Sequence, residues 1–383
     1  MSLSGREQTS GVGSFDFAVV GGGVVGLSIA YGLARIGHRV LTLDEDDFAT
    51  RASRGNFSLL WLPHKVAGVP GYARWARRSI SLWRQFASDL QTLTGIDVGL
   101  EQRGGFGLCL SAREFQEHIE DRERLEGALG QDGYPIHIVD RSELSRMLPA
   151  AGPQVVGGSF YPLNGQVNVL RLIGALHRAC ELAGGTYSAN SKVEMIKPRY
   201  GGFDIYSAGR VLSVPRIVLA AGLGNARLAP MVGLDAPIFP QRGQLMITEK
   251  LDRFIDFPTD TVRQTDEGGI MIGSSKEYVG LDTSTTSSAL SNLASVAVRM
   301  FPALARARIV RAWAALRVMT ADECPIYDQS ESCHGAYLVA CHYGVTLAAV
   351  HALVLAQRIG TDDLAGRFKA FGARRFSDVQ EAA

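Results

Sequence analysis

Hydrophobic and polar positions form their clearest pattern near the start of the chain. Residues 17–20 are a short apolar run, typical of a buried strand, and residues 27–36 carry apolar side chains at helical spacing. Gly37 stands where a helix C-terminus favours a left-handed residue, and residues 40–43 are a second apolar run. The pattern predicts a strand, a helix and a second strand in succession, with the glycine-rich turn 21–26 between the first two.

The turn has Gly-x-Gly-x-x-Gly spacing. Gly21 would make the tight turn, Gly23 would let the backbone approach a pyrophosphate, and Gly26 would let the helix pack closely on its strand. The helix N-terminus favours negative charge at this turn, and Asp44 at the end of the second strand could accept hydrogen bonds from an adenosine ribose. The motif alone is weak, but the full order of elements indicates a dinucleotide site. Asp44 would repel a 2′-phosphate, which disfavours NADP.

Helical and strand-like patterns alternate through the rest of the chain. Helical spacing predicts helices at residues 71–93, 112–129, 169–183, 288–301 and 345–359. Apolar or alternating runs predict strands at residues 104–110, 134–139, 193–196, 202–206, 211–214, 217–222, 244–248, 269–273, 309–317 and 336–340. The runs at 217–222 and 336–340 both lead into turns of small residues, as the first strand does. We therefore expect the nucleotide-binding domain to resume at both.

These elements predict an α/β protein with two interwoven domains. A Rossmann-like dinucleotide-binding domain is expected to alternate along the chain with an α+β substrate domain that has a mixed or antiparallel sheet. A length of 383 residues suits two such domains. The expected division assigns residues 1–14 to a flexible N-terminus, residues 15–70, 150–236 and 321–383 to the nucleotide-binding domain, and residues 71–149 and 237–320 to the substrate domain.

Composition narrows the class of protein. Hydrophobic residues make up 46% and charged residues 20% of the chain, which is typical of a soluble globular protein, and a net charge of +1 gives no reason to expect nucleic acid as a partner. The longest apolar windows, residues 19–33 and 337–355, are interrupted by glycine or histidine and predict no membrane span. The 5 cysteines lack Cys-x-x-Cys or Cys/His ligand spacing, which favours a reducing cytoplasm and argues against a metal site.

Four blocks of sequence carry a resemblance over nearly the whole chain. They are residues 20–26 with Asp44, residues 218–222, residues 240–244, and residues 313–317 with Asp322, Pro325 and residues 344–347. Their order and spacing resemble those of the D-amino-acid oxidase, glycine oxidase and sarcosine oxidase superfamily of FAD-dependent amine oxidoreductases. The chain departs from the family at Ala315 and Val318, where glycine and proline are common. The resemblance therefore does not determine the local backbone shape there.

Two segments resemble a narrower group within that superfamily. Residues 52–57 and 341–348 look most like the catalytic B subunits of bacterial opine dehydrogenases, the octopine and nopaline oxidases, and of hydroxyproline dehydrogenases. This resemblance implies an alpha subunit, a small iron–sulfur gamma subunit, and an FMN at a subunit interface. Basic residues that could serve the FMN phosphate, or simply form a solvated face, are His64, Lys65, Arg74, Arg77 and Arg78.

The resemblance implies an extended FAD with its ribose at Asp44 and its isoalloxazine ring against residues 344–347. The helix that begins at Val345 would place positive dipole near the flavin N1 and C2 carbonyl, where negative charge collects on reduction. The implied FAD contacts are Gly21, Gly23, Val24, Val25, Gly26, Asp44, Glu45, Arg51, Ala52, Ser53, Asn56, Val193, Ala221, Gly222, Arg317, Gly344, Val345, Thr346 and Leu347.

The family pattern also implies two residues for the chemistry. Arg317 would hold the substrate carboxylate in a bidentate pair, with structural pairing to an acid such as Asp322 as the alternative. His342 could assist deprotonation of the amine with a pKa near neutrality, or be a packed, hydrogen-bonded residue. Cys341 is expected to pack against the flavin ring, and Glu277 could favour a cationic substrate tail. The expected reaction moves a hydride from the carbon bearing the amine to flavin N5, and water hydrolyses the imine.

Several readings of the function stay open at this point. The main one is the catalytic beta subunit of a cytoplasmic, heteromeric dehydrogenase for an amino acid or opine, associated peripherally with a membrane through its electron acceptor. Alternatives are a stand-alone glycine, sarcosine or D-amino-acid oxidase that uses oxygen, a hydroxyproline dehydrogenase, an NAD-linked dehydrogenase, and a flavin-carrying subunit that only relays electrons. Side-chain selectivity depends on loops whose shapes the sequence does not give.

Overall fold

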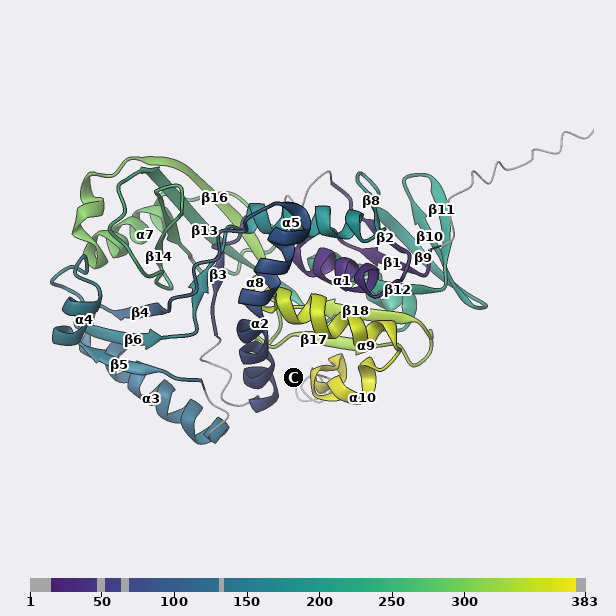
Figure 1. Cartoon of the computed structure of the whole chain (residues 1–383), viewed down its shortest axis with the longest axis horizontal. Coiled ribbons are helices and arrows are strands. Elements are labelled where there is room, and N and C mark those ends of the chain that lie inside the picture. The colour runs from purple at the N-terminus through teal and green to yellow at the C-terminus, as the bar shows by residue number, and fades with distance from the viewer. Residues whose placement is uncertain (1–14, 47–51, 63–68, 131–133, 377–383) are drawn as a thin grey trace, which may run out of the picture.

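A computed structural model describes residues 15–46, 52–62, 69–130 and 134–376. Figure 1 shows two groups of elements side by side, with a long helix between them. At the right is a six-stranded sheet in the order β17-β18-β12-β1-β2-β8. All neighbours pair in parallel except β17, which is antiparallel to β18. The strands are β1 (Phe17–Val20), β2 (Val40–Leu43), β8 (Thr186–Ser188), β12 (Arg216–Leu219), β17 (Ile326–Gln329) and β18 (Ala336–Ala340).

Alternation along β1 decides what covers each face of this sheet. Phe17 and Val19 belong to a core cluster with α1 (Val24–Arg35), α5 (Val169–Leu182) and α8 (Gly344–Val350). Ala18 and Val20 belong to a second cluster with the three-stranded antiparallel sheet of β9 (Val193–Arg199), β10 (Gly202–Ser207) and β11 (Arg210–Val214). Because both faces are covered, all residues of β1 are buried, as a central parallel strand requires.

The other group of elements is built on an antiparallel sheet in the order β14-β15-β13-β16 (Figure 1). One face packs on α7 (Ser287–Met300), since Met246, Ile270 and Ile272 share a core cluster with that helix. The residues that alternate with these point to the opposite face. The strands are β13 (Phe239–Lys250), β14 (Val262–Gln264), β15 (Gly269–Gly273) and β16 (Ile309–Met319).

Smaller elements complete the chain. The helix between the two groups, α2 (Pro70–Thr94), packs against α5 and α8. A three-stranded antiparallel sheet has the order β4-β6-β5, and β3 pairs with β7. The bounds are β3 (Leu59–Leu60), β4 (Gly105–Cys109), β5 (His137–Asp140), β6 (Gly157–Tyr161), β7 (Gly165–Gln166), α3 (Ala112–Leu129), α4 (Arg141–Met147), α6 (Asn225–Leu228), α9 (Ala356–Gly360) and α10 (Leu364–Phe368).

The predicted fold class is confirmed, with differences in detail. The bounds predicted for β1, β2, β18 and α3 match the structure, whereas β6, β14, β17 and α4 were not predicted. The helix expected at 345–359 is α8 and α9 joined by a π-helical turn, His351–Leu355. The expected domain division stays a prediction. Two packings bear on it. β6 pairs with β4 and β5, and α2 packs on α5 and α8, which cover the six-stranded sheet.

Within the described ranges, no helix combines the length and the apolar character needed to cross a membrane. The cytoplasmic location stays a prediction.

A buried histidine begins the π-helical turn. His351 is 0% exposed, and its Nε2 lies 2.8 Å from the Tyr327 hydroxyl, which accepts a hydrogen bond from Trp75 Nε1 at 3.1 Å. Since the indole can only donate, Tyr327 can donate its own proton to the imidazole. Burial lowers the pKa of His351 to about 3, so the side chain is neutral at neutral pH.

Replacing His351 with glutamine should reduce the acid sensitivity of the fold. From pH 6.5 down to about 3, the unfolded chain binds a proton at His351 that the folded chain excludes, so the free energy of unfolding falls as the pH falls. One such proton changes it by about 1.4 kcal/mol per pH unit. Urea unfolding at pH 4.5 to 7 should show a slope smaller by about that amount for His351→Gln. His334→Gln, at an exposed position, is the control, and equal slopes for wild type and His351→Gln would contradict the prediction.

Candidate active site

A cavity of about 1100 Å³ joins the two groups of elements. On one side it is lined by the β1–α1 turn, the end of β2, residues 52–56, the end of β12 and the β18–α8 turn. On the other side it is lined by β13 to β16, with Ile247, Met271 and Trp313 among the wall residues. Small-molecule sites usually occupy about 300 to 1,000 Å³. The cavity is therefore large enough for a ligand of dinucleotide size and a small substrate together.

Two glycines bring the first helix onto its strand. Gly21 has a φ of +112°, which favours glycine, and a Cβ there would strike the Ala220 carbonyl. A Cβ at Gly26 would overlap the Gly21 carbonyl oxygen. The close approach of helix and strand that the sequence predicted at Gly26 is thus observed. It fixes the N-terminus of α1 at the carboxyl end of β1, next to the cavity.

The N-terminus of α1 can receive an anion. Gly23 is the N-cap and makes no side-chain cap bond, and the first turn has no acidic residue. Val24 N donates instead to Ser53 Oγ at 3.0 Å, and a Cβ on Gly23 would lie 3.0 Å from the same oxygen. A single side-chain oxygen thus lies where the helix N–H groups converge. This turn, which a Cβ at Gly23 would partly fill, fits the pyrophosphate of a dinucleotide.

Asp44 is held by the backbone at the end of β2. Its Oδ2 accepts from Gly22 N, and its Oδ1 accepts from Asp46 N at 3.0 Å. Asp44 lines the cavity together with Glu45, whose carboxylate lies 3.9 Å from Lys192 Nζ. A carboxylate fixed in this way is oriented before any ribose arrives.

The cavity brings together most of the residues implied to bind FAD. Those that line it are Gly21, Gly23, Val24, Val25, Asp44, Glu45, Ala52, Ser53, Asn56, Val193, Ala221, Gly222, Gly344 and Val345. Four others do not line it, namely Gly26, Arg317, Thr346 and Leu347. Arg51 lies outside the described residues. The Thr346 hydroxyl accepts from Trp61 N at 3.1 Å, and the Leu347 side chain is buried in the core.

A second helix begins at the same cavity. Tyr343 is the N-cap of α8 and makes no side-chain cap bond, and Val345 in the first turn lines the cavity. A Cβ on Gly344 would lie 2.9 Å from a methyl group of Val25 in α1, so the two helices meet at their first turns. The positive ends of both helix dipoles therefore face one cavity.

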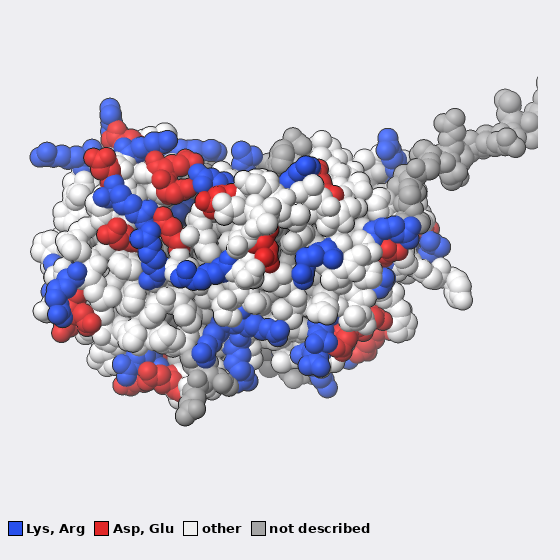
Figure 2. Space-filling view, in the orientation of Figure 1, with Lys and Arg blue, Asp and Glu red and all other residues white. Residues whose placement is uncertain are grey.

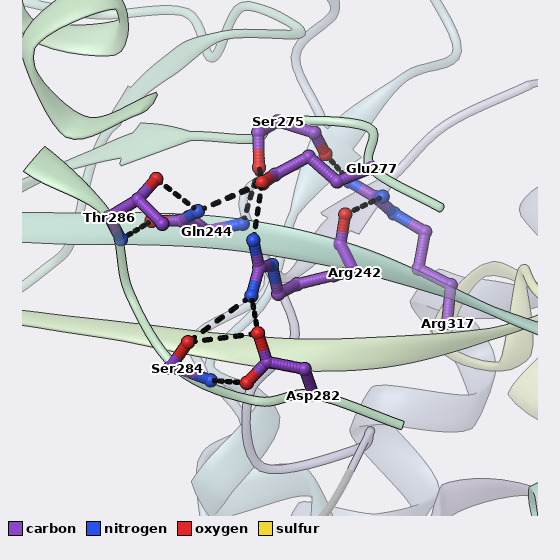
Figure 3. Close-up of polar contacts among 8 residues, drawn as sticks. All are labelled: Arg242, Gln244, Ser275, Glu277, Asp282, Ser284, Thr286 and Arg317. Atoms are coloured by element: carbon purple, nitrogen blue, oxygen red, sulfur yellow. Dashed lines mark hydrogen bonds and ion pairs between the residues drawn. The ribbon is translucent and has the colours of Figure 1, made fainter. Parts of the chain in front are cut away.

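Arg317 is held in place by polar groups of β13 and the segment after β15 (Figure 3). Its Nη1 donates to Gln241 Oε1 at 2.9 Å, and its Nη2 donates to the Ser275 carbonyl at 2.8 Å and to Ser274 Oγ. Burial lowers its pKa. Asp322, the example named for a structural acid partner of Arg317, bonds Arg375 at 2.8 Å instead, so that pairing is wrong.

Figure 3 also shows why the segment after β15 is fixed. Arg242, which is 3% exposed, bonds both Glu277, at 2.7 Å, and Asp282. Gln244 bonds Glu277 and Thr286. Arg242 lowers the pKa of Glu277 and occupies its carboxylate. The expectation that Glu277 lines the pocket is therefore not supported, since it belongs to this network and not to the cavity wall.

His342 faces the cavity, but its pKa is far from neutrality. Burial, with smaller effects of Arg317 and Lys276, lowers that pKa to about 3. The predicted pKa near neutrality is wrong, because no carboxylate offsets the desolvation of the ring. His342 is neutral at neutral pH and can donate one hydrogen bond and accept another. Burial raises the pKa of Cys341 to about 12, which agrees with packing and not with a nucleophile.

The sequence reasoning missed the residues on the sheet side of the cavity. Glu101, Gln166, Arg263 and Arg311 all line it. Arg263 lies on β14, a strand of three residues that no apolar run had predicted. The sequence indicated this strand only weakly, because the strand consists of one arginine between an apolar and a polar residue.

The fold and the cavity suit a protein that binds a dinucleotide. The family model described as DAO, FAD dependent oxidoreductase, matches residues 16–358, so the chain belongs to that family and FAD is its cofactor. The prediction of an FAD-dependent oxidoreductase is confirmed.

Two similar proteins carry the same descriptive name. The B subunit of opine oxidase from Agrobacterium tumefaciens (strain Ach5) is 45% identical, over 95% of this chain and 98% of the relative. The B subunit of opine oxidase from Rhizobium meliloti is 44% identical, over 96% of this chain and 99% of the relative. The solved structure of glycine oxidase from Geobacillus kaustophilus has a TM-score of 0.83 at 24% identity and covers 91% of this chain and 95% of that chain, which shows a shared fold.

Replacing Gly23 with valine should lower FAD affinity while leaving the fold intact. The nearest atom to a Cβ at this position is the Ser53 hydroxyl oxygen, which can move, whereas a pyrophosphate would meet the new side chain directly. We expect a loss of at least about tenfold in affinity, which corresponds to about 1.4 kcal/mol. Flavin absorbance after dialysis measures it. Gly127→Ala, where a Cβ meets nothing within 4 Å, is the control, and full flavin content in Gly23→Val would count against this site.

Proposed function

We propose that this chain oxidises the carbon–nitrogen bond of an amino acid with a secondary amine, of the opine class. The observation that carries the proposal is the continuity of one cavity from two helix N-termini to a sheet face that bears arginines. The former suit a flavin dinucleotide, and the latter suit a carboxylated substrate. The names of the relatives at 45% and 44% identity support the opine class.

Bound FAD would supply the acceptor for a hydride leaving the carbon that bears the amine. The chain itself has to orient the substrate and keep its amine unprotonated, because an ammonium has no lone pair to drive loss of hydride. Arg317 would orient the substrate through its carboxylate. His342 would serve as a neutral hydrogen-bond partner beside the amine, since a group with a pKa of about 3 is too weak a base to take a proton from an ammonium. The proton would go to water.

The position of the Arg317 side chain depends on the segment that follows β15. Ser274 and Ser275 bond the guanidinium. The contacts of Arg242 with Glu277 and Asp282 hold the rest of that segment (Figure 3).

Arg317→Met should raise the Michaelis constant far more than it disturbs flavin content. Loss of hydrogen bonds to a charged carboxylate costs about 3 kcal/mol, or about a hundredfold. The measurement is anaerobic flavin bleaching with a panel of opines, D-amino acids, hydroxyproline isomers, sarcosine and glycine. Arg317→Lys keeps the charge and should recover part of the loss. Bleaching by glycine or sarcosine but by no opine would overturn the opine assignment, and an unchanged Michaelis constant would remove Arg317 from the substrate site.

We also infer that the chain works with partner subunits. Support comes from the relatives, which are named as subunits, and from the surface of α2. Arg74 and Arg78 on α2 are exposed, and Arg77 is partly buried. Figure 2 shows blue side chains grouped at the lower centre, where Figure 1 places α2, with no red side chain among them. Such a surface suits the phosphate of an FMN at an interface. His64 and Lys65 lie outside the described residues.

Co-expression with the proteins encoded beside it should test this role. The chain produced alone is expected to bind FAD but to pass electrons slowly to dyes, and the complex is expected to contain FMN as well and to turn over at least about tenfold faster. Flavin analysis and dye reduction measure both. Arg74→Glu with Arg78→Glu should lower FMN content and leave FAD content unchanged. FAD as the only flavin and equal activity in both preparations would defeat the proposal, and peroxide release would favour a stand-alone oxidase.

A further inference from the structure

The cavity wall contains a buried arginine, Arg263. Arg263 is 5% exposed and lines the cavity. Its Nε donates to the Phe57 carbonyl at 2.5 Å and its Nη1 to Gln166 Oε1 at 3.3 Å, whereas Nη2 meets the Met271 sulfur at 2.8 Å. No carboxylate in the described part of the chain forms an ion pair with it. Because a thioether is a weak acceptor, the guanidinium keeps donor capacity beside the cavity.

The nearest carboxylates are already engaged elsewhere. Both oxygens of Glu101 accept from Arg253, at 2.8 and 2.6 Å, and one also accepts from Gln166 Nε2 at 2.9 Å. Asp266 pairs with Arg171 at 2.7 Å. Burial lowers the pKa of Arg263 to about 10, although Asp266 and Glu101 act in the opposite direction. A buried charge without a hydrogen-bonded counterion is costly, and an anion in the cavity would supply the missing partner.

Strand register places this arginine on the wall that faces the cavity. Arg263 pairs with Met271, Met271 with Ile247, and Ile247 with Arg311, so these four form one row across the sheet. The opposite face packs on α7, as Met246 and Ile272 show. Gln241, which pairs with Arg317, lies six positions from Ile247 and so projects to the same face. The side chains of Arg263 and Arg317 therefore project from the same face of the sheet.

The two guanidinium groups are separated along that face. A Cβ on Gly243 would lie 2.6 Å from Arg317 Nη2, so that guanidinium lies over Gly243. Gly243 is four residues from Ile247, a distance of roughly 13 Å along a strand. A ligand that reaches both guanidinium groups must therefore carry two acidic groups that point in opposite directions. One with a single carboxylate can reach only one of them.

We propose that Arg263 is a specificity-determining residue that binds a second carboxylate of the substrate. The proposal rests on the opine reading of the function and deepens it. An N-(carboxyalkyl) amino acid has one carboxylate on each side of its secondary nitrogen. If Arg317 binds one carboxylate and Arg263 binds the other, the two contacts together orient the carbon–hydrogen bond next to the nitrogen. Glycine and sarcosine, with one carboxylate, lack the second.

The test compares two ligands that differ by one carboxylate. Dissociation constants of the FAD-loaded protein are measured under anaerobic conditions, from flavin absorbance, for N-(1-carboxyethyl)arginine and for N-ethylarginine. Arg263→Met should weaken binding of the first ligand by about ten- to a hundredfold and of the second by less than about threefold. Arg263→Lys should recover part of the loss. Arg308→Met, at an exposed residue paired with Glu249 outside the cavity, should change neither.

Two outcomes would overturn the role of Arg263. Equal weakening of both ligands would show a structural role in holding Phe57 and β14, and unchanged binding of both would show no role. If Arg263→Met loses FAD, the same comparison is made with Arg263→Lys. Because lysine is shorter, this variant should bind the dicarboxylate more weakly than the wild type does and should bind the monocarboxylate equally well.

A separate arm distinguishes this inference from the opine proposal. If the wild type oxidises no opine, the proposed function fails, and Arg263 is then judged by glutarate and butyrate, which cannot be oxidised. Weaker binding of glutarate by Arg263→Met, with butyrate unchanged, supports a second acid-binding residue whatever the amine substrate is. Glutarate binding equal to that of the wild type, or no glutarate binding by the wild type, overturns it.

Discussion

The convergence of two helix N-termini on one cavity is the constraint on which the rest of this structure depends. The strands that precede α1 and α8 run parallel in one sheet, so both helices start at the same edge. Their first turns can meet because Gly26 packs on Gly21 and Gly344 packs on Val25. Backbone N–H groups and helix dipoles thereby add positive potential at this edge. A long, doubly anionic cofactor suits such an edge.

The nucleotide-binding half was predictable because its constraints are local. Glycine spacing, apolar runs and Asp44 lie within thirty residues of one another, and the turn geometry follows from them. The substrate side of the cavity was not predictable, because the residues that form its wall depend on which strands pair. Arg263 becomes a wall residue only because β14 pairs with β15, a contact that the sequence pattern does not reveal. The pKa predicted for His342 was wrong for a similar reason, because desolvation of the ring depends on the whole surrounding fold.

The antiparallel sheet gives its two faces different tasks through alternation. On β13 and β15, Met246 and Ile272 bind the sheet to α7, while Ile247 and Met271 face the cavity. Arg242 and Gln244 tie the segment after β15 down through Glu277. Arg263 on β14 and Arg317 on β16 lie on strands at opposite edges of the sheet.

The outer strand of that sheet presents a different problem. β16 is eleven residues long and, in the described ranges, pairs with β13 alone, while Ile309 and Val310 on it are 47% and 68% exposed. A long apolar edge can template a strand from another chain. Arg308 and Arg311 flank this stretch, and charge at such a position opposes edge-to-edge aggregation. The strand that helps to enclose the cavity is thus also the one that these arginines guard against amyloid-like association.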